Sequence, residues 1–217
     1  QGIMVGYACN ENDEYIPHEL YLARDLCKSI YSYFPYDGKT QITLEDGKIK
    51  TVVASFQNAS KEQLEQVVVE WLQYHTDDVD IFCNPAGDWT MGGFDADAGV
   101  TGRKLVVDNY GPRVPIGGGA FSGKDSSKVD RSAAYMARRI AVDLLKDHDA
   151  EEVYVYLAYA IGYDKPVQVS AIIDGKDVGV VGYDLSPNGI VKTLGLQEPK
   201  FEKTAEWGHM GTGQVWG

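Results

Sequence analysis

The chain has 217 residues, of which 44% are apolar and 24% are charged, a composition that suits one large or two smaller folded domains. No uninterrupted apolar run reaches the roughly 18 residues of a transmembrane helix, and no signal pattern opens the sequence. The formal net charge of −12 argues against broad binding to nucleic acid or anionic membranes, because both need a basic surface. We therefore expect a soluble, cytoplasmic protein that binds neither nucleic acid nor membrane.

The cysteines and histidines indicate no zinc or redox centre. Cys9, Cys27 and Cys83 are widely spaced, without a C-x-x-C pair, so we expect three reduced, buried thiols. The four histidines are also far apart, with no H-x-x-x-H or H-E-x-x-H arrangement. Any metal bound by this chain should therefore have oxygen ligands.

The first part of the chain predicts alternating helices and strands. A proline followed by apolar residues at three- and four-residue steps indicates a helix, and Asp46-Gly47 favours a hairpin turn between two β-prone runs. Ser60 and Gln63 form the pattern of a capping box before a second helix. In chain order we expect a loop at residues 1–14, a helix at 17–34, strands at 40–45 and 48–57, a helix at 61–75 and a strand at 78–84.

A long glycine-rich passage, residues 85–123, divides the chain. Glycine weakens both helices and strands, and a long loop in a compact domain is usually functional. A short apolar run at 104–109 is the one strand expected inside it. The elements expected after it are a helix at 127–147, strands at 152–161, 167–173 and 178–181, a capped helix at 187–194, and a mostly loop segment from residue 197.

The order of elements in the first half partly recurs in the second, so we expect two related α+β units. The helix at 127–147 presents one apolar face. Its arginines are expected on the solvent side or at a subunit interface: Arg131, Arg138 and Arg139.

Basic residues are concentrated at 101–139, which holds eight bases against three acids. A compact cationic region in an acidic protein attracts a small multivalent anion and discourages a long one. Glycines in the same region let the backbone approach such a ligand. We therefore expect residues 101–131 to bind a polyphosphate, most simply that of a nucleotide.

Residues 118–124 read G-G-A-F-S-G-K, which satisfies the spacing of a Walker A loop through Lys124. Asp125 follows where that motif has a Ser or Thr hydroxyl for magnesium, and a carboxylate there would repel phosphate. A P-loop phosphotransferase is therefore kept as an alternative and not as the main interpretation.

A series of motifs across nearly the whole chain resembles S-adenosylmethionine synthetases of the bacterial and eukaryotic type. TGRK, GGGAFSGKD and SKVDRSAAY stand between residues 101 and 135, accompanied in order by QGIMVGYACNE, DGKTQIT, NPAGDWTMGG, YAIG and KTAEWGHMG. The resemblance implies an α+β fold with two of three pseudo-repeated α/β sandwich domains, whose helices pack on mixed or antiparallel sheets. The central domain would cover 1–91 and the C-terminal domain 92–217.

The activity implied by the resemblance is that of a methionine adenosyltransferase. Methionine sulfur would displace the triphosphate of ATP at C5′, and the tripolyphosphate would be hydrolysed to phosphate and diphosphate. A highly charged leaving group needs fixed cations, and the attack needs in-line alignment. The resemblance also implies Mg²⁺ and K⁺ as cofactors, ATP and L-methionine as substrates, and a homodimer or dimer of dimers with shared active sites.

The resemblance assigns site residues position by position. Lys39 would reach phosphate, and Trp89 would stack on adenine where the family has Phe. The ATP-binding residues it implies are Asp37, Gly38, Lys39, Asp88, Trp89, Asp97, Arg103, Lys104, Ala120 and Lys124, of which Lys39, Arg103 and Lys124 would be catalytic. The methionine-binding residues are Asp97, Lys128 and Ile161, and Asp130 is the metal ligand.

The chain departs from the family's pattern in several places. Asp88 stands where the family usually has arginine, and the loop at 113–116 differs. Ile161 would serve equally well as strand-end core. The family's N-terminal domain, with its His-Pro-Asp-Lys motif, is not matched, so we expect no turnover by this chain alone and a separate N-terminal domain chain as a further partner. A non-catalytic binding or assembly protein is the second alternative.

Overall fold

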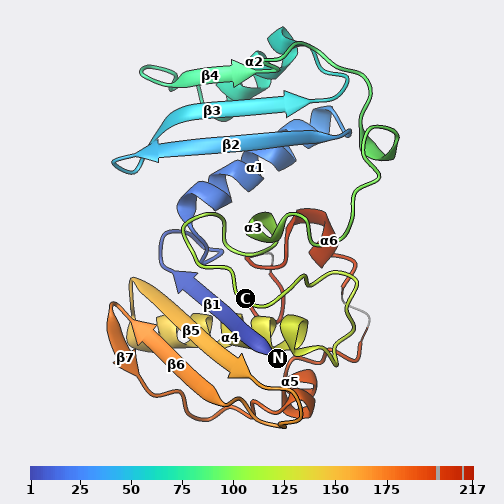
Figure 1. Ribbon diagram of the computed structural model, residues 1–217. Coiled ribbons are helices and arrows are strands. Elements are labelled where there is room, and N and C mark those ends of the chain that lie inside the picture. The colour runs from blue at the N-terminus through green and yellow to red at the C-terminus, as the bar shows by residue number, and fades with distance from the viewer. Residues whose placement is uncertain (199–200, 212) are drawn as a thin grey trace. The chain divides into compact units, whose positions relative to one another are not determined.

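The computed structural model describes residues 1–198, 201–211 and 213–217, and the chain forms two compact units (Figure 1). The central unit is His18–Gly99, and the C-terminal unit combines Gln1–Pro17 with Val100–Gly217. These units divide the chain differently from the domains expected at 1–91 and 92–217, which stay a prediction. No helix within the described ranges is long and apolar enough to cross a membrane.

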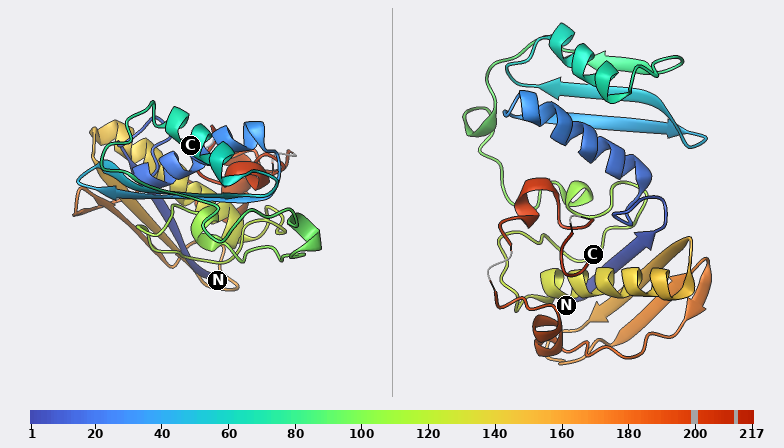
Figure 2. Two further views of the ribbon diagram at one scale, coloured as in Figure 1. Left: turned by 90° about the horizontal axis from the view of Figure 1, so that it is seen from above. Right: turned by 180° about the vertical axis from the view of Figure 1, so that it is seen from behind.

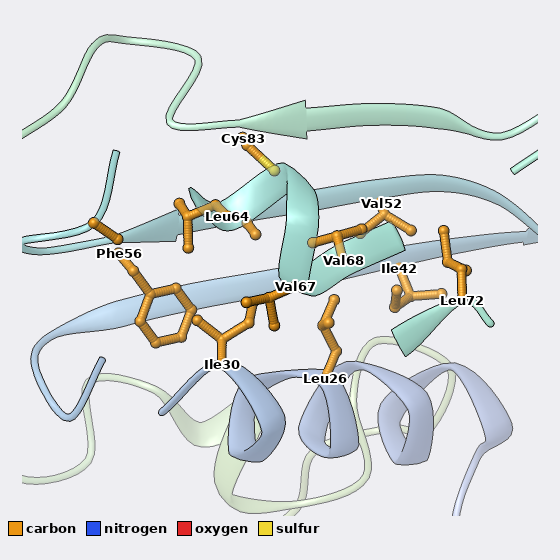
Figure 3. Packing of buried hydrophobic residues seen from close by; sticks show 12 residues of the cluster. Leu26, Ile30, Ile42, Val52, Phe56, Leu64, Val67, Val68, Leu72 and Cys83 are labelled. Carbon is orange, nitrogen blue, oxygen red and sulfur yellow. The ribbon is translucent and has the colours of Figure 1, made fainter. Parts of the chain in front are cut away.

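The central unit is a mixed three-stranded sheet, ordered β2-β3-β4, with both helices on one face (Figure 3). β2 and β3 form the predicted hairpin, whose turn residues Asp46 and Gly47 have φ of 49° and 75°, while β4 runs parallel to β3. The elements are α1 (His18–Tyr33), β2 (Gly38–Glu45), β3 (Lys48–Phe56), α2 (Lys61–Trp71), β4 (Asp80–Cys83) and the 3-10 helix η1 (Gly93–Asp95).

Helices and sheet of the central unit share one apolar core. Ile30 of α1 lies beside Phe56 of β3, Leu26 points into the same layer further along α1, and apolar residues of α2 complete it (Figure 3). The Phe56 ring also lies against Gly38, where a Cβ would come within 2.3 Å of it. This contact fixes the start of β2, and with it the neighbouring Asp37 and Lys39.

The C-terminal unit is a four-stranded antiparallel sheet, ordered β1-β5-β6-β7. The long helix α4 lies along one face of this sheet (Figure 2). Its packing on β1 is close, since a Cβ on Gly6 would come within 2.0 Å of the Ala137 carbonyl. The elements are β1 (Gly2–Cys9), α3 (Leu105–Asp108), α4 (Val129–His148), β5 (Glu152–Tyr159), β6 (Gln168–Ile173), β7 (Lys176–Val178), α5 (Pro187–Thr193) and α6 (Thr204–Trp207).

Both units confirm the predicted α+β class, and most elements agree with the sequence to within a few residues. Three expectations were wrong. Residues 1–14 are not all loop, because β1 pairs with β5. The run at 104–109 forms the short helix α3 instead of a strand, and the strand expected at 178–181 ends at Val178. α6 lies in the loop predicted from residue 197, of which residues 199, 200 and 212 fall outside the described residues.

Two arginines of α4 are buried, contrary to the expectation of a solvent or interface position. Arg138 is 0% exposed and donates to backbone carbonyls at 2.7–2.9 Å, and Arg131 is 3% exposed. Arg139 is partly exposed and bonds Asp143 on the next turn. The carbonyl acceptors of Arg138 belong to Tyr7, Glu14, Tyr15 and Gly217.

Candidate functional site

The residues predicted for the site fall in both units. In the C-terminal unit they gather around the triple glycine, Gly117–Gly119, which lies against the backbone of Ile3 in β1. A Cβ on Gly117 would come within 2.3 Å of the Ile3 carbonyl, so glycine is required for this approach. The loop is thereby fixed to the edge of the sheet.

Lys124 and Asp130 form an ion pair over this glycine loop. Lys124 Nζ lies 2.5 Å from Asp130 Oδ2, and the two side chains are 31% and 28% exposed. A Cβ on Gly119 would lie 2.8 Å from the lysine Nζ and 3.2 Å from the same carboxylate oxygen. The predicted phosphate-binding lysine and the predicted metal ligand are therefore direct neighbours, reachable from solvent.

The second basic segment, residues 101–104, packs beside the glycine loop. Gly102 has φ of +83°, and a Cβ there would come within 2.4 Å of the Ala120 side chain. This contact brings Arg103 and Lys104, both exposed, to the same part of the unit as Lys124. The structure thus groups four of the predicted ATP-binding residues.

Lys128 and Ile161 both have exposed side chains. Lys128 is exposed, with its Nζ 3.8 Å from Asp125 Oδ2 and 3.2 Å from Ser127 Oγ. Ile161 follows the end of β5 and is 76% exposed, so the core position considered for it is wrong. Neither residue has a contact that assigns it to methionine.

A network of buried polar side chains supports residues 122–124 of the glycine loop, and the sequence did not predict it. Arg131 donates from Nη1 to the carbonyl of Lys124 at 2.9 Å and from Nε to the Tyr135 hydroxyl at 3.0 Å. The same hydroxyl contacts His209 Nδ1 at 2.6 Å, and His209 Nε2 lies 3.2 Å from Ser122 Oγ. Three of these residues lie in the motifs SKVDRSAAY and KTAEWGHMG, so those motifs were the sequence feature that could have indicated the network.

Arg131 Nε donates to the Tyr135 hydroxyl, and that hydroxyl is in hydrogen-bond contact with His209 Nδ1. The other ring nitrogen of His209, Nε2, contacts Ser122 Oγ and lies 4.0 Å from Asp108 Oδ1. Trp216 stacks on Tyr135 at 3.9 Å between ring centroids and closes the network from solvent. Both ends of the segment 122–124 are thereby fixed.

In the central unit, the segment 89–93 folds back onto the start of β2. Asp37 Oδ2 accepts from the Gly93 N–H at 3.1 Å, and Gln57 donates from Nε2 to the Thr90 carbonyl at 2.8 Å. The Trp89 carbonyl accepts from the N–H of Asn58 at 2.9 Å. Asp37, Trp89 and Gln57 therefore lie together, and Gln57 is a member that the sequence did not indicate.

Trp89 lies against Gly92, where a Cβ would come within 2.8 Å of the indole ring. Lys39 and Asp97 are exposed, and Asp97 Oδ1 accepts from the N–H of Gly99 at 2.9 Å. Asp88 differs from its neighbours, because its carboxylate accepts from the Lys61 N–H at 3.0 Å and from the Asn84 amide at 3.2 Å. The Asp88 side chain therefore stabilises the start of α2.

A metal bound by this chain would depend on its carboxylate oxygens. In the part that the structure describes, no group of three or more His, Cys, Asp or Glu side chains could hold an ion. Magnesium is, however, usually bound by one or two carboxylates together with substrate phosphates and water. Asp130 supplies one such carboxylate beside the glycine loop, and this arrangement fits a metal held jointly with phosphate.

The fold does not support the P-loop alternative. In a P-loop, a strand leads into the glycine loop and a helix begins directly at its lysine. Here α3 precedes the loop, and α4 begins at Val129, after Lys124. The sheet of this unit is antiparallel, whereas P-loop folds are built on parallel strands.

Comparisons with known proteins agree on one family. The model of the S-adenosylmethionine synthetase C-terminal domain matches residues 91–216, and that of the central domain matches residues 1–89. The S-adenosylmethionine synthase of Petrotoga mobilis is 40% identical over 250 residues, covering 99% of this chain and 62% of the relative. That of Pseudothermotoga lettingae is 41% identical, covering 97% and 62%.

A solved structure supports the same assignment. An unusual S-adenosylmethionine synthetase from Campylobacter jejuni has a TM-score of 0.87 at 32% identity, and the match covers 100% of this chain and 68% of that one. The chain spans about 62% of the length of the curated relatives named above. On these matches, the chain belongs to the S-adenosylmethionine synthetase family.

Proposed function

We propose that this chain supplies the polyphosphate-binding and adenine-binding parts of a methionine adenosyltransferase, which forms S-adenosylmethionine from ATP and L-methionine. The observation that carries the proposal is the ion pair of Lys124 and Asp130 over the triple glycine, beside the exposed Arg103 and Lys104. Fixed cations at a glycine loop favour the charge that accumulates on a leaving triphosphate. Family membership then indicates which triphosphate reaction the site serves.

Each group of residues would have its own task. Lys124, Arg103 and Lys104 would hold the triphosphate, and Ala120 would let it approach the backbone. Trp89 would stack on adenine, with Asp37, Gly38 and Lys39 beside it at the start of β2. Asp97, Lys128 and Ile161 are proposed for the methionine side on the resemblance alone.

Asp130 is the proposed magnesium ligand. When bound, Mg²⁺ would supply positive charge where the leaving triphosphate becomes more negative. The chain's own contribution is to fix Asp130 in the first turn of α4 and Lys124 in the loop that Arg131 holds. K⁺, a homodimer or dimer of dimers with shared sites, a separate N-terminal domain chain and a cytoplasmic location are proposed from the family.

The test is to incubate the chain with ATP, methionine, Mg²⁺ and K⁺, with and without the N-terminal part of the Petrotoga mobilis relative as a second chain. We expect S-adenosylmethionine when both chains are present and no turnover from the 217 residues alone. Robust turnover by this chain alone would contradict the assignment of essential groups to the unmatched part of the relatives. Pairing without turnover, and without ATP binding, would favour the assembly-protein alternative.

Binding provides a direct test of the site. Lys124→Ala should weaken tripolyphosphate and ATP by about 1.5–3 kcal/mol, the usual worth of a hydrogen bond to a charged group, and leave adenosine binding unchanged. Isothermal titration calorimetry with the three ligands measures this difference. Equal losses for ATP and adenosine would reject the role of Lys124 in binding phosphate.

A further inference from the structure

The Gln57 side chain connects two segments of the central unit that are far apart in the sequence. Gln57 directly follows β3, and its backbone N–H donates to the Asp37 carbonyl at 2.8 Å. Its side-chain Nε2 donates to the Thr90 carbonyl at 2.8 Å, and its Oε1 accepts from the N–H of Asp37 at 3.4 Å. An amide side chain offers both donors and an acceptor. One residue therefore joins the start of β2 to the segment 89–93.

The same amide lies against the backbone of Gly92. A Cβ at this position would come within 2.4 Å of Gln57 Oε1 and within 2.8 Å of the Trp89 indole ring. Gly92 has a φ of −148°, on the negative side that residues with side chains also adopt. Glycine is therefore needed here for space, and that space is bordered by the Gln57 amide and the Trp89 ring.

The position of the Trp89 ring depends on how the segment 89–93 is held. Trp89 Nε1 is buried, and no hydrogen-bond partner for it lies among the residues that the structure describes. The Trp89 carbonyl accepts from the N–H of Asn58, the residue after Gln57, at 2.9 Å. The ring is thus placed by the backbone contacts and the packing of its segment, and not by a polar contact of the indole.

A base stacks on an aromatic side chain only when the ring presents its face at the right place. Loss of the Gln57 amide would release Thr90 and Gly92, which follow Trp89 directly, from the start of β2. The ring would then move relative to Asp37, although no group that touches the base had been removed. An effect of this kind concerns the nucleoside part of a nucleotide and not its phosphates.

We propose that Gln57 is a positioning residue of the nucleotide site. It holds the segment 89–93 against the start of β2, so that the Trp89 ring and the Asp37 carboxylate stay together for the adenosine part of the ligand. The proposal rests on the proposed function, since it assumes that Trp89 stacks on adenine.

The test is calorimetric titration of the full chain with adenosine and, separately, with tripolyphosphate. In Gln57→Ala we expect adenosine to bind about three- to tenfold more weakly, as for the loss of one hydrogen bond, and tripolyphosphate to bind as in the wild type. Lys124→Ala should show the reverse pattern. A loss confined to adenosine identifies positioning, because general destabilisation would weaken both ligands.

Two further variants displace the same amide in other ways. Gly92→Ala adds a methyl group where Gln57 Oε1 and the Trp89 ring lie, so it should weaken adenosine as Gln57→Ala does. The double variant should bind adenosine no more weakly than either single variant, because both changes disturb one contact. Gln57→Glu keeps the acceptor for Asp37 but sets a carboxylate oxygen against the Thr90 carbonyl, so adenosine should again bind more weakly.

Gln66→Ala is the matched control. It removes the same amide from an exposed position of α2, where Nε2 donates to Glu70 at 3.0 Å. Adenosine affinity should stay at the wild-type value. Hydrogen exchange of the ligand-free chain gives a second readout: peptides covering residues 89–94 should exchange faster in Gln57→Ala and at the wild-type rate in Gln66→Ala.

Unchanged adenosine affinity in Gln57→Ala, with adenosine bound by the wild type, would overturn the proposal and leave the proposed function in place. Equal losses for adenosine and tripolyphosphate would also overturn it. Failure of the proposed function gives a different result, namely no binding of either ligand by the wild-type chain. Tripolyphosphate binding without adenosine binding by the wild type would reject the role of Trp89 and the proposal with it. Gln57→Glu, which keeps the size of the side chain, replaces Gln57→Ala should circular dichroism show that variant unfolded.

Discussion

The Asp88 carboxylate accepts a hydrogen bond from the backbone N–H of Lys61 at 3.0 Å. Lys61 is the first residue of α2, so Asp88 satisfies one of the amide groups that a helix start leaves unpaired, and it places negative charge at the positive end of the helix. Ser60 and Gln63 form the predicted capping box at the same helix end. Asp88 thus has a structural role where the resemblance implied a nucleotide contact.

The first prediction is that Asp88→Ala destabilises α2 and leaves ATP affinity unchanged. The loss should be about 1 kcal/mol, the usual cost of removing a helix cap. Hydrogen exchange measures it as faster exchange in peptides covering residues 58–66. Asp77→Ala, at an exposed loop carboxylate, is the control without an effect. Weaker ATP binding by Asp88→Ala, with unchanged hydrogen exchange, would contradict this prediction and support a nucleotide contact by Asp88.

Local patterns in the sequence predicted local structure well. The capping box, the Asp46-Gly47 turn and the apolar face of α4 each depend on residues within one or two turns of the chain, and all three are present. β1 was missed because its partner is far away in sequence, with Gly2 opposite Tyr159. The apolar run at 104–109 predicted a strand and forms the helix α3, because a local pattern is a weak guide where tertiary contacts decide.

In the site, too, local features could be predicted and contacts between distant residues could not. The resemblance pointed to Lys124 and Asp130, but spacing gives no sign that they pair with each other. Arg131 and Arg138 were placed on the surface because charged residues are seldom fully buried without partners. Their partners are backbone carbonyls and side chains up to 131 positions away, and no periodic pattern reports those.

The second prediction concerns Tyr135, whose hydroxyl connects Arg131 to His209. Tyr135→Phe keeps the ring that stacks on Trp216 but removes the buried hydroxyl that accepts from Arg131 Nε and contacts His209 Nδ1. The free energy of unfolding should fall by about 2–3 kcal/mol, as measured by urea denaturation. Tyr156→Phe, on a half-buried strand position, should change it by less than about 0.5 kcal/mol.

The third prediction is that Arg138→Lys is strongly destabilising although it keeps the charge. Arg138 uses three nitrogens to reach four carbonyls, including those of Tyr7 and Gly217. A lysine ammonium is a single point and cannot reproduce this fork. We expect a loss of about 3–5 kcal/mol, as for other broken buried charge contacts. Arg139→Lys, at the partly exposed neighbouring residue, is the control. Its melting temperature in thermal denaturation should differ little from that of the wild type.

The fourth prediction follows from Cys83, where burial raises the pKa of the thiol from 9.0 to about 11. A raised folded-state pKa contributes stability that is fully present below pH 9 and is lost as the pH rises through 11. At pH 8 the thiol is protonated, so iodoacetamide should modify Cys83 only after the central unit opens. Mass spectrometry of the labelled peptides, with and without urea, checks this. Rapid labelling of the folded chain at pH 8 would contradict it.

The last prediction returns to the glycine loop. Gly119 does not need a positive φ, and the nearest atom to an added Cβ is the Lys124 Nζ at 2.8 Å, the free end of a flexible side chain. Gly119→Ala should therefore cost little stability but push Lys124 away from Asp130. We expect tripolyphosphate affinity to fall by about tenfold, or 1.4 kcal/mol, because the lysine can no longer lie over the loop. Calorimetric titration gives the affinity and thermal denaturation the stability.

The matched control for Gly119→Ala is Gly179→Ala, whose added Cβ would meet nothing within 4 Å. It should leave tripolyphosphate affinity and stability at wild-type values. A contrasting variant is Gly102→Ala, where φ is +83° and the Ala120 side chain would lie 2.4 Å away. That change strains the backbone itself, so it should lower both stability and affinity. If Gly119→Ala also lost stability to the same extent, the loop would depend on glycine for its fold, and the reduced affinity would no longer report the position of Lys124.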